Sequence, residues 1–372
     1  MREVAMSDCG SDRPTIAVVG GGNGSYTAAA DLALAGHTVR FRPGSPDRHG
    51  DVLRTRSITI TGLGRTGVAE PQLVSQDTGA VVKGADIVIC TDPAFTQPNR
   101  ATLIAPHLSD GQLVFLSPGS LGSYLVATAV RALGNLADIT YAEPGTLPYL
   151  TRKIGPCEVQ VSGLAIHLPI GVYPARHTDR AMTCLRALFP GAHAVEDALS
   201  VALLNVGPTI HSVLVLLNTG AIEHFPSWDI HNEGTTPSVK KLILALDAER
   251  IAVRTALGYA GPHYPIADHY HPQSDREWMY GRGGHTDLVE SEKWRESLSF
   301  AHRYIREDVH ETLALLASIG DLAGVDTPLA DSILHLVGAI TGCDHLHEGR
   351  TLAALGLGDK SVDEVKRLLW EG

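Results

Sequence analysis

The sequence predicts two domains, an α/β domain built on a parallel sheet followed by an all-helical domain. A chain of 372 residues is longer than one hydrophobic core usually serves. Up to about residue 189, short β-branched runs alternate with helical patterns, whereas only long helical patterns follow Gly191. This change and the Pro-Gly pair before it predict domains over 15–193 and 194–372, after a disordered tail over 1–14.

The α/β domain begins with an apolar strand that runs into a glycine cluster. Residues 15–25 read Thr-Ile-Ala-Val-Val-Gly-Gly-Gly-Asn-Gly-Ser, followed by a helical pattern over Tyr26–Ala35 and a second strand over His37–Phe41. Glycines at such a turn let the backbone approach a pyrophosphate, whose charge the helix N-terminus stabilises. The alternative is a tight turn in another α/β fold. The strand–turn–helix context favours a Rossmann-type domain that binds a dinucleotide through Gly20, Gly22, Asn23, Gly24 and Ser25.

The end of the second strand indicates which nicotinamide cofactor binds. An NAD-binding domain usually has an acidic residue there for the ribose hydroxyls, but this strand ends in Arg40-Phe41-Arg42-Pro43-Gly44-Ser45. Arg42 and Ser45 offer a cation and a hydroxyl to a 2′-phosphate, so the sequence favours NADP(H) over NAD(H). The alternative is that Arg40 and Arg42 are solvated charges on an edge strand. Ser25 departs from the fingerprint, which usually has a third glycine or alanine there.

Three further strands are predicted over Asp86–Cys90, Gln112–Leu116 and Asp138–Ala142. The segments that follow them, among them the one with Pro93, lie at the carboxyl edge of the predicted sheet, where open α/β folds bind ligands. We therefore expect the nicotinamide end of the cofactor, and Pro93, in this region. Ordinary turn chemistry is the alternative, because Pro and Gly follow many strands.

Composition and charge argue against several kinds of partner. The 30 basic and 41 acidic residues give a net charge of −11, which disfavours nucleic acid. The apolar stretch Val201–Leu217 is interrupted by Asn205, Pro208 and His211, so no membrane span is predicted. The five cysteines are scattered without metal-type spacing, and residues 1–14 lack the apolar core of a secretory signal. We expect reduced thiols, no metal and a cytoplasmic protein.

The second domain places polar residues on an apolar helix that begins near Pro208. His211 and Asn218 are seven residues apart and share a face of this helix, where each needs a polar partner. Taken alone, His211 is as consistent with a hydrogen-bonded core histidine as with a cleft residue. The helices predicted in this domain cover Val195–Leu204, Pro208–Ile222, Ser238–Leu257, Asp308–Ala323 and Thr327–Thr341.

The order of several short motifs resembles the opine dehydrogenase family, also called octopine/nopaline dehydrogenases. The match covers nearly the whole chain after residue 14. Its motifs are Gly-Gly-Gly-Asn-Gly at 20–24, Leu-Pro-Tyr at 147–149, Asn205 and His211 ahead of Leu217–Glu223, Thr236-Pro237, Leu246–Arg250, Arg306–Val309, Val325–Pro328 and Gly349-Arg350.

The resemblance implies a reaction and two residues that carry it. Enzymes of this family condense the amine of an amino acid with an α-keto acid and reduce the imine with NAD(P)H. His211 matches the family's catalytic histidine and Asp308 its aspartate partner. A histidine exchanges protons near neutral pH, and a carboxylate fixes its tautomer. Without the resemblance, Asp308 would be interpreted as a charge in the first turn of a helix. We expect the helical domain to be 6-phosphogluconate-dehydrogenase-C-terminal-like.

Both substrates would bring a carboxylate, so the cleft expected between the domains needs cationic or amide donors. One candidate is Arg152, for which the alternative is an ordinary surface charge. The stretch His263–His285 contains four histidines, and we interpret it as a polar lid or loop over the substrate rather than as a metal site. The candidate substrate donors are Arg152, Asn205, Asn218 and Thr236.

Two other functions remain open at this point. One is an NADPH-dependent reductase of keto acids, of the ketopantoate type, with no amine substrate. The other is a dinucleotide-binding regulator without turnover. In every case small molecules are the expected partners, and a homodimer is a possible assembly.

Overall fold

A computed structural model describes residues 13–270, 278–281 and 294–372, and its contacts divide the chain into two compact units. The first unit holds Met1–Ala198 with Leu369–Gly372, and the second holds Leu199–Leu368. The division therefore falls shortly after the boundary expected at residue 193. Most of the predicted tail, residues 1–12, lies outside the described residues.

The first unit is built on a mixed sheet. Among its described residues, eight strands run in the order β12-β11-β8-β7-β6-β1-β2-β5. Neighbouring strands are parallel except for the antiparallel pair β8 and β11, so the expected α/β class is confirmed with one antiparallel addition. The strands are β1 (Thr15–Val19), β2 (Thr38–Arg42), β5 (Leu73–Val74), β6 (Ile87–Cys90), β7 (Leu113–Leu116), β8 (Thr140–Pro144), β11 (Leu168–Tyr173) and β12 (Ala192–Ala194).

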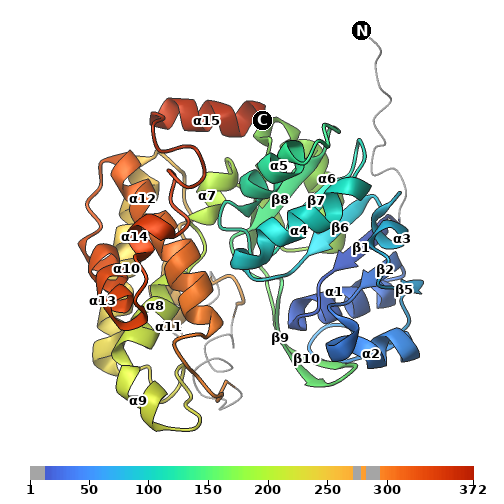
Figure 1. Ribbon diagram of the computed structural model, residues 1–372, viewed down its shortest axis with the longest axis horizontal. Coiled ribbons are helices and arrows are strands. Elements are labelled where there is room, and N and C mark those ends of the chain that lie inside the picture. The colour runs from blue at the N-terminus through green and yellow to red at the C-terminus, as the bar shows by residue number, and fades with distance from the viewer. Residues whose placement is uncertain (1–12, 271–277, 282–293) are drawn as a thin grey trace. The chain divides into compact units, whose positions relative to one another are not determined.

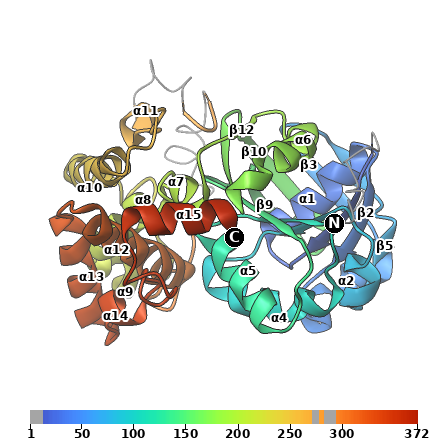
Figure 2. The ribbon, with the colours of Figure 1, turned by 90° about the horizontal axis from the view of Figure 1, so that it is seen from above.

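Helices cover both faces of this sheet. The central strands β6 and β7 are buried along their whole length, which explains their unbroken apolar sequence. Figure 2 shows α4 and α5 on one side of the sheet and α1 and α6 on the other. The helices of this unit are α1 (Asn23–Leu34), α2 (Pro46–Thr55), α3 (Thr78–Val82), η1 (Ala94–Thr96), α4 (Gln97–Ile104), η2 (Ala105–His107), α5 (Gly122–Ala132), η3 (Ala175–His177) and α6 (Thr178–Leu188).

A second, smaller sheet was not predicted from the sequence. Its described strands run in the order β4-β3-β10-β9, and all four contact α1. Thr27 and Thr151 share a hydrogen bond of 2.7 Å, and Tyr149 donates to Asp31 at 2.9 Å. The helix after the glycine cluster is thus enclosed by two sheets, which explains its almost wholly buried surface. The strands are β3 (Ile58–Gly62), β4 (Gly67–Ala69), β9 (Tyr149–Gly155) and β10 (Glu158–Leu164).

The second unit is helical throughout its described residues, apart from one isolated bridge between Trp228 and Glu296 (Figure 1). The apolar helix α8 contacts η6, α10 and α13. The helices are α7 (Ala198–Ala202), which begins at the end of the first unit, then α8 (Gly207–Leu217), α9 (Thr219–His224), α10 (Pro237–Ala256), α11 (Ile266–Tyr270), η6 (Tyr304–Leu313), α12 (Ala314–Ala323), α13 (Pro328–Thr341), α14 (His345–Glu348) and α15 (Val362–Glu371), which ends in the first unit.

A buried arginine ties several of these segments together. Arg250 on α10 donates to Asp247 at 2.7 Å, to the Leu203 carbonyl at 2.8 Å and to the His263 carbonyl at 3.0 Å. A buried arginine needs such partners because an unpaired charge is costly away from water. The Leu246–Arg250 motif therefore has a structural role in this unit.

Two sequence expectations need correction. The helix expected over Asp308–Ala323 begins earlier, and residues Tyr304–Leu313 form a π-helix, a rare form often found at functional sites. Cys184 is disulfide-bonded, so the expectation of five reduced thiols is wrong for this residue, although Cys90, Cys157 and Cys343 are free.

The stretch Ala198–Leu217 is the helical segment of the described residues that is long and apolar enough to cross a membrane, with a mean hydropathy of 1.7. Within the structure, 67% of this stretch is buried. Such burial is typical of a core helix in a soluble protein. The stretch consists of the two helices α7 and α8.

Candidate active site

The turn between β1 and α1 has the shape of an anion site. Gly20 has a φ of +149°, and a Cβ there would lie 2.4 Å from Ser25 Oγ and 2.9 Å from Asp92 Oδ1. Only glycine fits this position without strain. At Gly22, the N-cap of α1, an added Cβ would meet nothing within 4 Å. The backbone thus leaves open space at a helix N-terminus, which fits the pyrophosphate of a dinucleotide.

The structure explains why a serine is tolerated at position 25. The buried Ser25 hydroxyl is 2.6 Å from Thr91 Oγ1, so it has a polar partner at the end of β6. This bond brings the segment of Thr91, Asp92 and Pro93 beside the glycine turn, as expected for strand ends at one sheet edge. Arg100 donates to Asp92 at 2.7 Å. Burial raises the pKa of Asp92, and the Arg100 guanidinium partly offsets this rise.

The end of β2 holds a cation next to this turn. The Arg42 carbonyl accepts from Gly20 N–H at 3.0 Å, while its guanidinium donates to Thr78 Oγ1 and to the Pro43 carbonyl, each at 3.1 Å. Ser45 is the N-cap of α2, and its side chain makes no capping hydrogen bond. Asn23 is occupied differently, because its side-chain oxygen accepts from Lys153 N–H at 3.1 Å. Arg42 therefore lies at the end of β2 next to the glycine turn, and Ser45 at the start of α2; their roles toward the cofactor stay predictions.

A second polar site lies in the helical unit. His211 on α8 and Asp308 on η6 are far apart in the sequence, yet Nδ1 of the imidazole lies 3.0 Å from Oδ2 of the carboxylate. The side chain of His211 is 17% exposed and that of Asp308 is 7% exposed. The carboxylate therefore engages Nδ1 and leaves Nε2 as the nitrogen able to exchange a proton with another molecule.

The start of α8 is built to admit the Asp308 carboxylate. A Cβ at Gly207 would lie 2.6 Å from Asp308 Oδ1, so glycine is needed for this approach. The carboxylate is thus placed at a helix N-terminus, where the helix dipole favours a negative charge. Asn205 lies at the same point, and its side-chain oxygen accepts from Gly207 N–H at 2.9 Å.

Two aromatic residues that the sequence did not single out surround His211. Tyr304 stacks on the imidazole with ring centres 4.1 Å apart, and His231 meets its edge at 5.2 Å. His231 Nε2 is 3.2 Å from the Tyr304 hydroxyl. Burial lowers the pKa of His231 well below its usual value, and the neighbouring His211 lowers it further. A neutral His231 adds no positive charge beside the His211 ring.

Sequence similarity decides the family. An opine dehydrogenase from Arthrobacter sp. (strain 1C) is 31% identical over 347 residues, which cover 92% of this chain and 95% of the relative. The chain belongs to the opine dehydrogenase family. Residues 194–341 also match the family model described as NAD/NADP octopine/nopaline dehydrogenase, alpha-helical domain. This opine dehydrogenase is therefore an NAD(P)-dependent enzyme that acts on CH–NH bonds.

Solved structures of the same class share the fold of this opine dehydrogenase. An octopine dehydrogenase with NADH and L-arginine matches with a TM-score of 0.71 and 18% identity, covering 95% of this chain and 97% of the other. A yersinopine dehydrogenase with NADP⁺ bound matches with a TM-score of 0.64 and 16% identity, covering 96% and 98%. The expected combination of a Rossmann-type domain and a helical domain is confirmed.

The four predicted substrate donors of the opine dehydrogenase have different surroundings. Asn205 lies beside the His211–Asp308 pair. Asn218 donates to the carbonyls of Leu214 and Gly234 and accepts from Trp228 Nε1 at 3.1 Å, so its amide already ties α8 to the segment before α10. Thr236 is the N-cap of α10, without a capping hydrogen bond from its side chain. Arg152 lies on β9 of the first unit, opposite Gln160 on β10. Their roles toward substrate stay predictions.

The histidine-rich stretch is described only in part. His271 and His285 lie outside the described residues. His263 accepts from Arg254 Nε at 3.2 Å, and the ring of the buried His269 contacts that of Trp278 in a tilted arrangement with ring centres 5.2 Å apart. These two histidines therefore support the packing around α10 and α11. The interpretation of the whole stretch as a lid stays a prediction.

Proposed function

We propose that His211 is the proton-transfer residue of this opine dehydrogenase and that Asp308 positions it. The reaction joins the amine of an amino acid to the carbonyl carbon of an α-keto acid with loss of water, and reduction of the imine gives a secondary amine. When bound, NAD(P)H supplies the hydride for this reduction. The observation that carries the proposal is the 3.0 Å contact between His211 Nδ1 and Asp308 Oδ2 in a chain of this family.

The surroundings of His211 suit a proton donor and acceptor. Asp308 holds Nδ1, so Nε2 takes a proton from the attacking amine or gives one to the departing hydroxyl of the carbinolamine. Tyr304 fixes the plane of the ring by stacking, because an imidazole between a carboxylate and an aromatic face has little freedom to rotate. Neutral His231 adds no competing charge. The same nitrogen carries the proton in the reverse oxidation.

Amine dependence tests this function. We expect purified protein to oxidise NADPH when an amino acid and an α-keto acid are both present, and not with either alone. Arginine and pyruvate, both present in structures of octopine dehydrogenase, begin the substrate panel. Oxidation of cofactor with a keto acid alone, at the rate seen with both, would instead identify a simple keto-acid reductase. No oxidation with any pair would favour a regulator that only binds the dinucleotide.

We also propose that the enzyme prefers NADPH. The guanidinium of Arg42 is held by Thr78 and the Pro43 carbonyl at the end of β2, and the side chain of Ser45 makes no capping bond at α2. A cation and a helix N-terminus together favour a 2′-phosphate. Arg40 is a contrasting residue, because it donates to the Lys83 carbonyl on an exposed part of the unit.

Replacing Arg42 with alanine is expected to raise the KM for NADPH about tenfold or more, because a charge-assisted hydrogen bond to phosphate is lost. The KM for NADH should change by less than about twofold, since NADH has no 2′-phosphate. Initial rates with both cofactors, in this variant and in Arg40→Ala, measure the effect. An unmodified enzyme that prefers NADH, or equal losses in the two variants, would contradict the proposed cofactor preference.

A further inference from the structure

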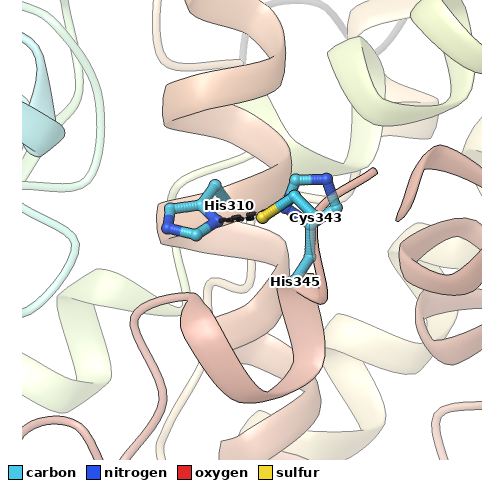
Figure 3. Close-up of side chains that lie close together, drawn as sticks. All are labelled: His310, Cys343 and His345. Atoms are coloured by element: carbon cyan, nitrogen blue, oxygen red, sulfur yellow. Dashed lines mark hydrogen bonds between the residues drawn. The ribbon is translucent and has the colours of Figure 1, made fainter. Parts of the chain in front are cut away.

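Three side chains of the helical unit form a cluster of potential metal ligands. None of them belongs to the His211–Asp308 pair. Figure 3 shows His310, Cys343 and His345 pointing toward one another. One ligand atom from each lies within 4.8 Å of the other two. The two Nδ1 atoms are 3.0 Å apart, and Cys343 Sγ is 3.8 Å from His310 Nδ1. Two imidazoles and a thiol form a donor set that Zn²⁺ prefers in proteins.

The distances are close to those of a tetrahedral site. With Zn–N bonds of about 2.05 Å and a Zn–S bond of about 2.3 Å, tetrahedral geometry separates two nitrogens by roughly 3.3 Å and sulfur from nitrogen by roughly 3.6 Å. The two separations that involve His310, 3.0 and 3.8 Å, need only small side-chain adjustments, and the third, between Cys343 Sγ and His345, is within 4.8 Å. Glu348 Oε2 accepts from Cys343 Sγ at 3.5 Å, although its carboxylate is not among the three ligand atoms that converge.

The hydrogen bonds around His345 fix its tautomer. Thr341 Oγ1 is 3.1 Å from His345 Nε2 and also donates its one proton to the Val337 carbonyl at 2.9 Å. The hydroxyl must therefore accept from His345, so Nε2 carries the hydrogen and Nδ1 has a free lone pair. That lone pair is directed toward His310. A metal-binding histidine commonly has its other nitrogen hydrogen-bonded in this way.

The backbone around the cluster is closely packed. A Cβ at Gly349 would lie 2.4 Å from the His310 carbonyl oxygen and 2.5 Å from that of His345, so only glycine allows these segments to meet. Arg350 N–H donates to the His310 carbonyl at 3.0 Å. His345 is buried, with 3% of its surface exposed. The ligand side chains are thus held by packed segments and not by a loose surface loop.

We propose that His310, Cys343 and His345 form a Zn²⁺ site with a fourth position open to water. The metal would join the π-helix η6, which also carries Asp308, to the connection between α13 and α14. Without metal, the pair of Nδ1 atoms shares one proton, and the Cys343 thiol donates to Glu348. Binding uses both Nδ1 lone pairs and the thiolate, so the Cys343 thiol proton is released for each Zn²⁺ bound, while the proton between the two neutral imidazoles shifts to Nε2 of His310.

This proposal revises the expectation of a protein without metal. The ligands come from two segments more than 30 residues apart, and the close pair has the spacing Cys-X-His, which is not a common zinc motif. The sequence therefore gave no signal. The site became visible only when the fold brought η6 beside the end of α13.

Metal content of the full-length, untagged and reduced protein tests the proposal. After incubation with Zn²⁺ and gel filtration, we expect about one zinc per chain by elemental analysis, and Cys343→Ser and His345→Gln should each retain less than about a fifth of it. The matched control is His347→Gln on α14, whose side chain is 82% exposed and paired with Asp344. This control should hold as much zinc as the unmodified chain.

Cobalt gives a second measurement that does not depend on how well a variant folds. Co²⁺ bound by the unmodified protein should show thiolate-to-cobalt charge-transfer absorption and the intense visible bands of tetrahedral coordination. The thiolate-to-cobalt charge-transfer absorption should disappear in Cys343→Ser. Zinc content equal in all four proteins, or cobalt bound without the charge-transfer band, would overturn the site. Neither readout uses catalysis, so a failure here is independent of the opine dehydrogenase reaction.

Discussion

Replacing His211 with alanine is expected to lower kcat for the amine-dependent reaction about 10²- to 10⁴-fold. The variant loses the nitrogen proposed to exchange protons with the reacting amine, whereas the glycine turn proposed to bind the cofactor is in the other unit and stays intact. Steady-state rates with saturating amino acid, keto acid and NADPH measure this loss. Cofactor binding, followed by quenching of protein fluorescence or by calorimetry, should be nearly unchanged.

A matched histidine variant separates this loss from general damage. His335 lies on α13 with an exposed side chain that bonds only to the carbonyl of Asp331 in the described structure. His335→Ala should retain the activity of the unmodified enzyme. If His211→Ala retained more than about a tenth of kcat, the proton-transfer role of His211 would be wrong.

Asp308→Asn is expected to lower kcat about 10²- to 10³-fold while keeping the shape of the side chain. The asparagine amide can present a donor to Nδ1, which favours the wrong tautomer and leaves Nε2 protonated. It also removes the negative charge that favours imidazolium formation. Steady-state rates at saturating amino acid, keto acid and NADPH measure this loss.

The rate per folded chain distinguishes a positioning role from a structural one. A purely structural Asp308 would lower the amount of folded protein and leave kcat per folded chain unchanged. Asp321→Asn, at an exposed carboxylate on α12, provides the control and should alter neither kcat nor the amount of folded protein. Since Asp308 acts through His211, the two substitutions should not be additive, and the double variant should be about as slow as His211→Ala.

The cofactor region was predictable because its signal is local. The strand, the glycine turn and the helix are contiguous, and the cation Arg42 follows on the next strand. Ser25 was the exception, because its partner Thr91 lies on a distant strand. The sequence also missed β9 and β10. β9 pairs with β10, and β10 pairs with β3 across about 100 residues of sequence.

The proximity of His211 and Asp308, the proposed catalytic pair, was predictable only in part. Pattern alone left His211 undecided, and the family resemblance identified it together with Asp308. Tyr304 is four residues before Asp308, so a helical-face argument could have found it, but the π-helix changes that spacing. His231 lies in a segment without periodicity and gave no signal. Its proximity to His211 arises from packing in the folded unit.

The most direct test of the central claim follows the transferred hydrogen. The enzyme would be supplied with an amino acid, an α-keto acid and NADPH that carries deuterium at the transferred position, and the products analysed by mass spectrometry. We predict a secondary amine that contains both carbon skeletons and one deuterium, on the carbon that was the keto carbonyl. A deuterated 2-hydroxy acid beside unchanged amino acid would contradict the assignment as an imine-reducing enzyme.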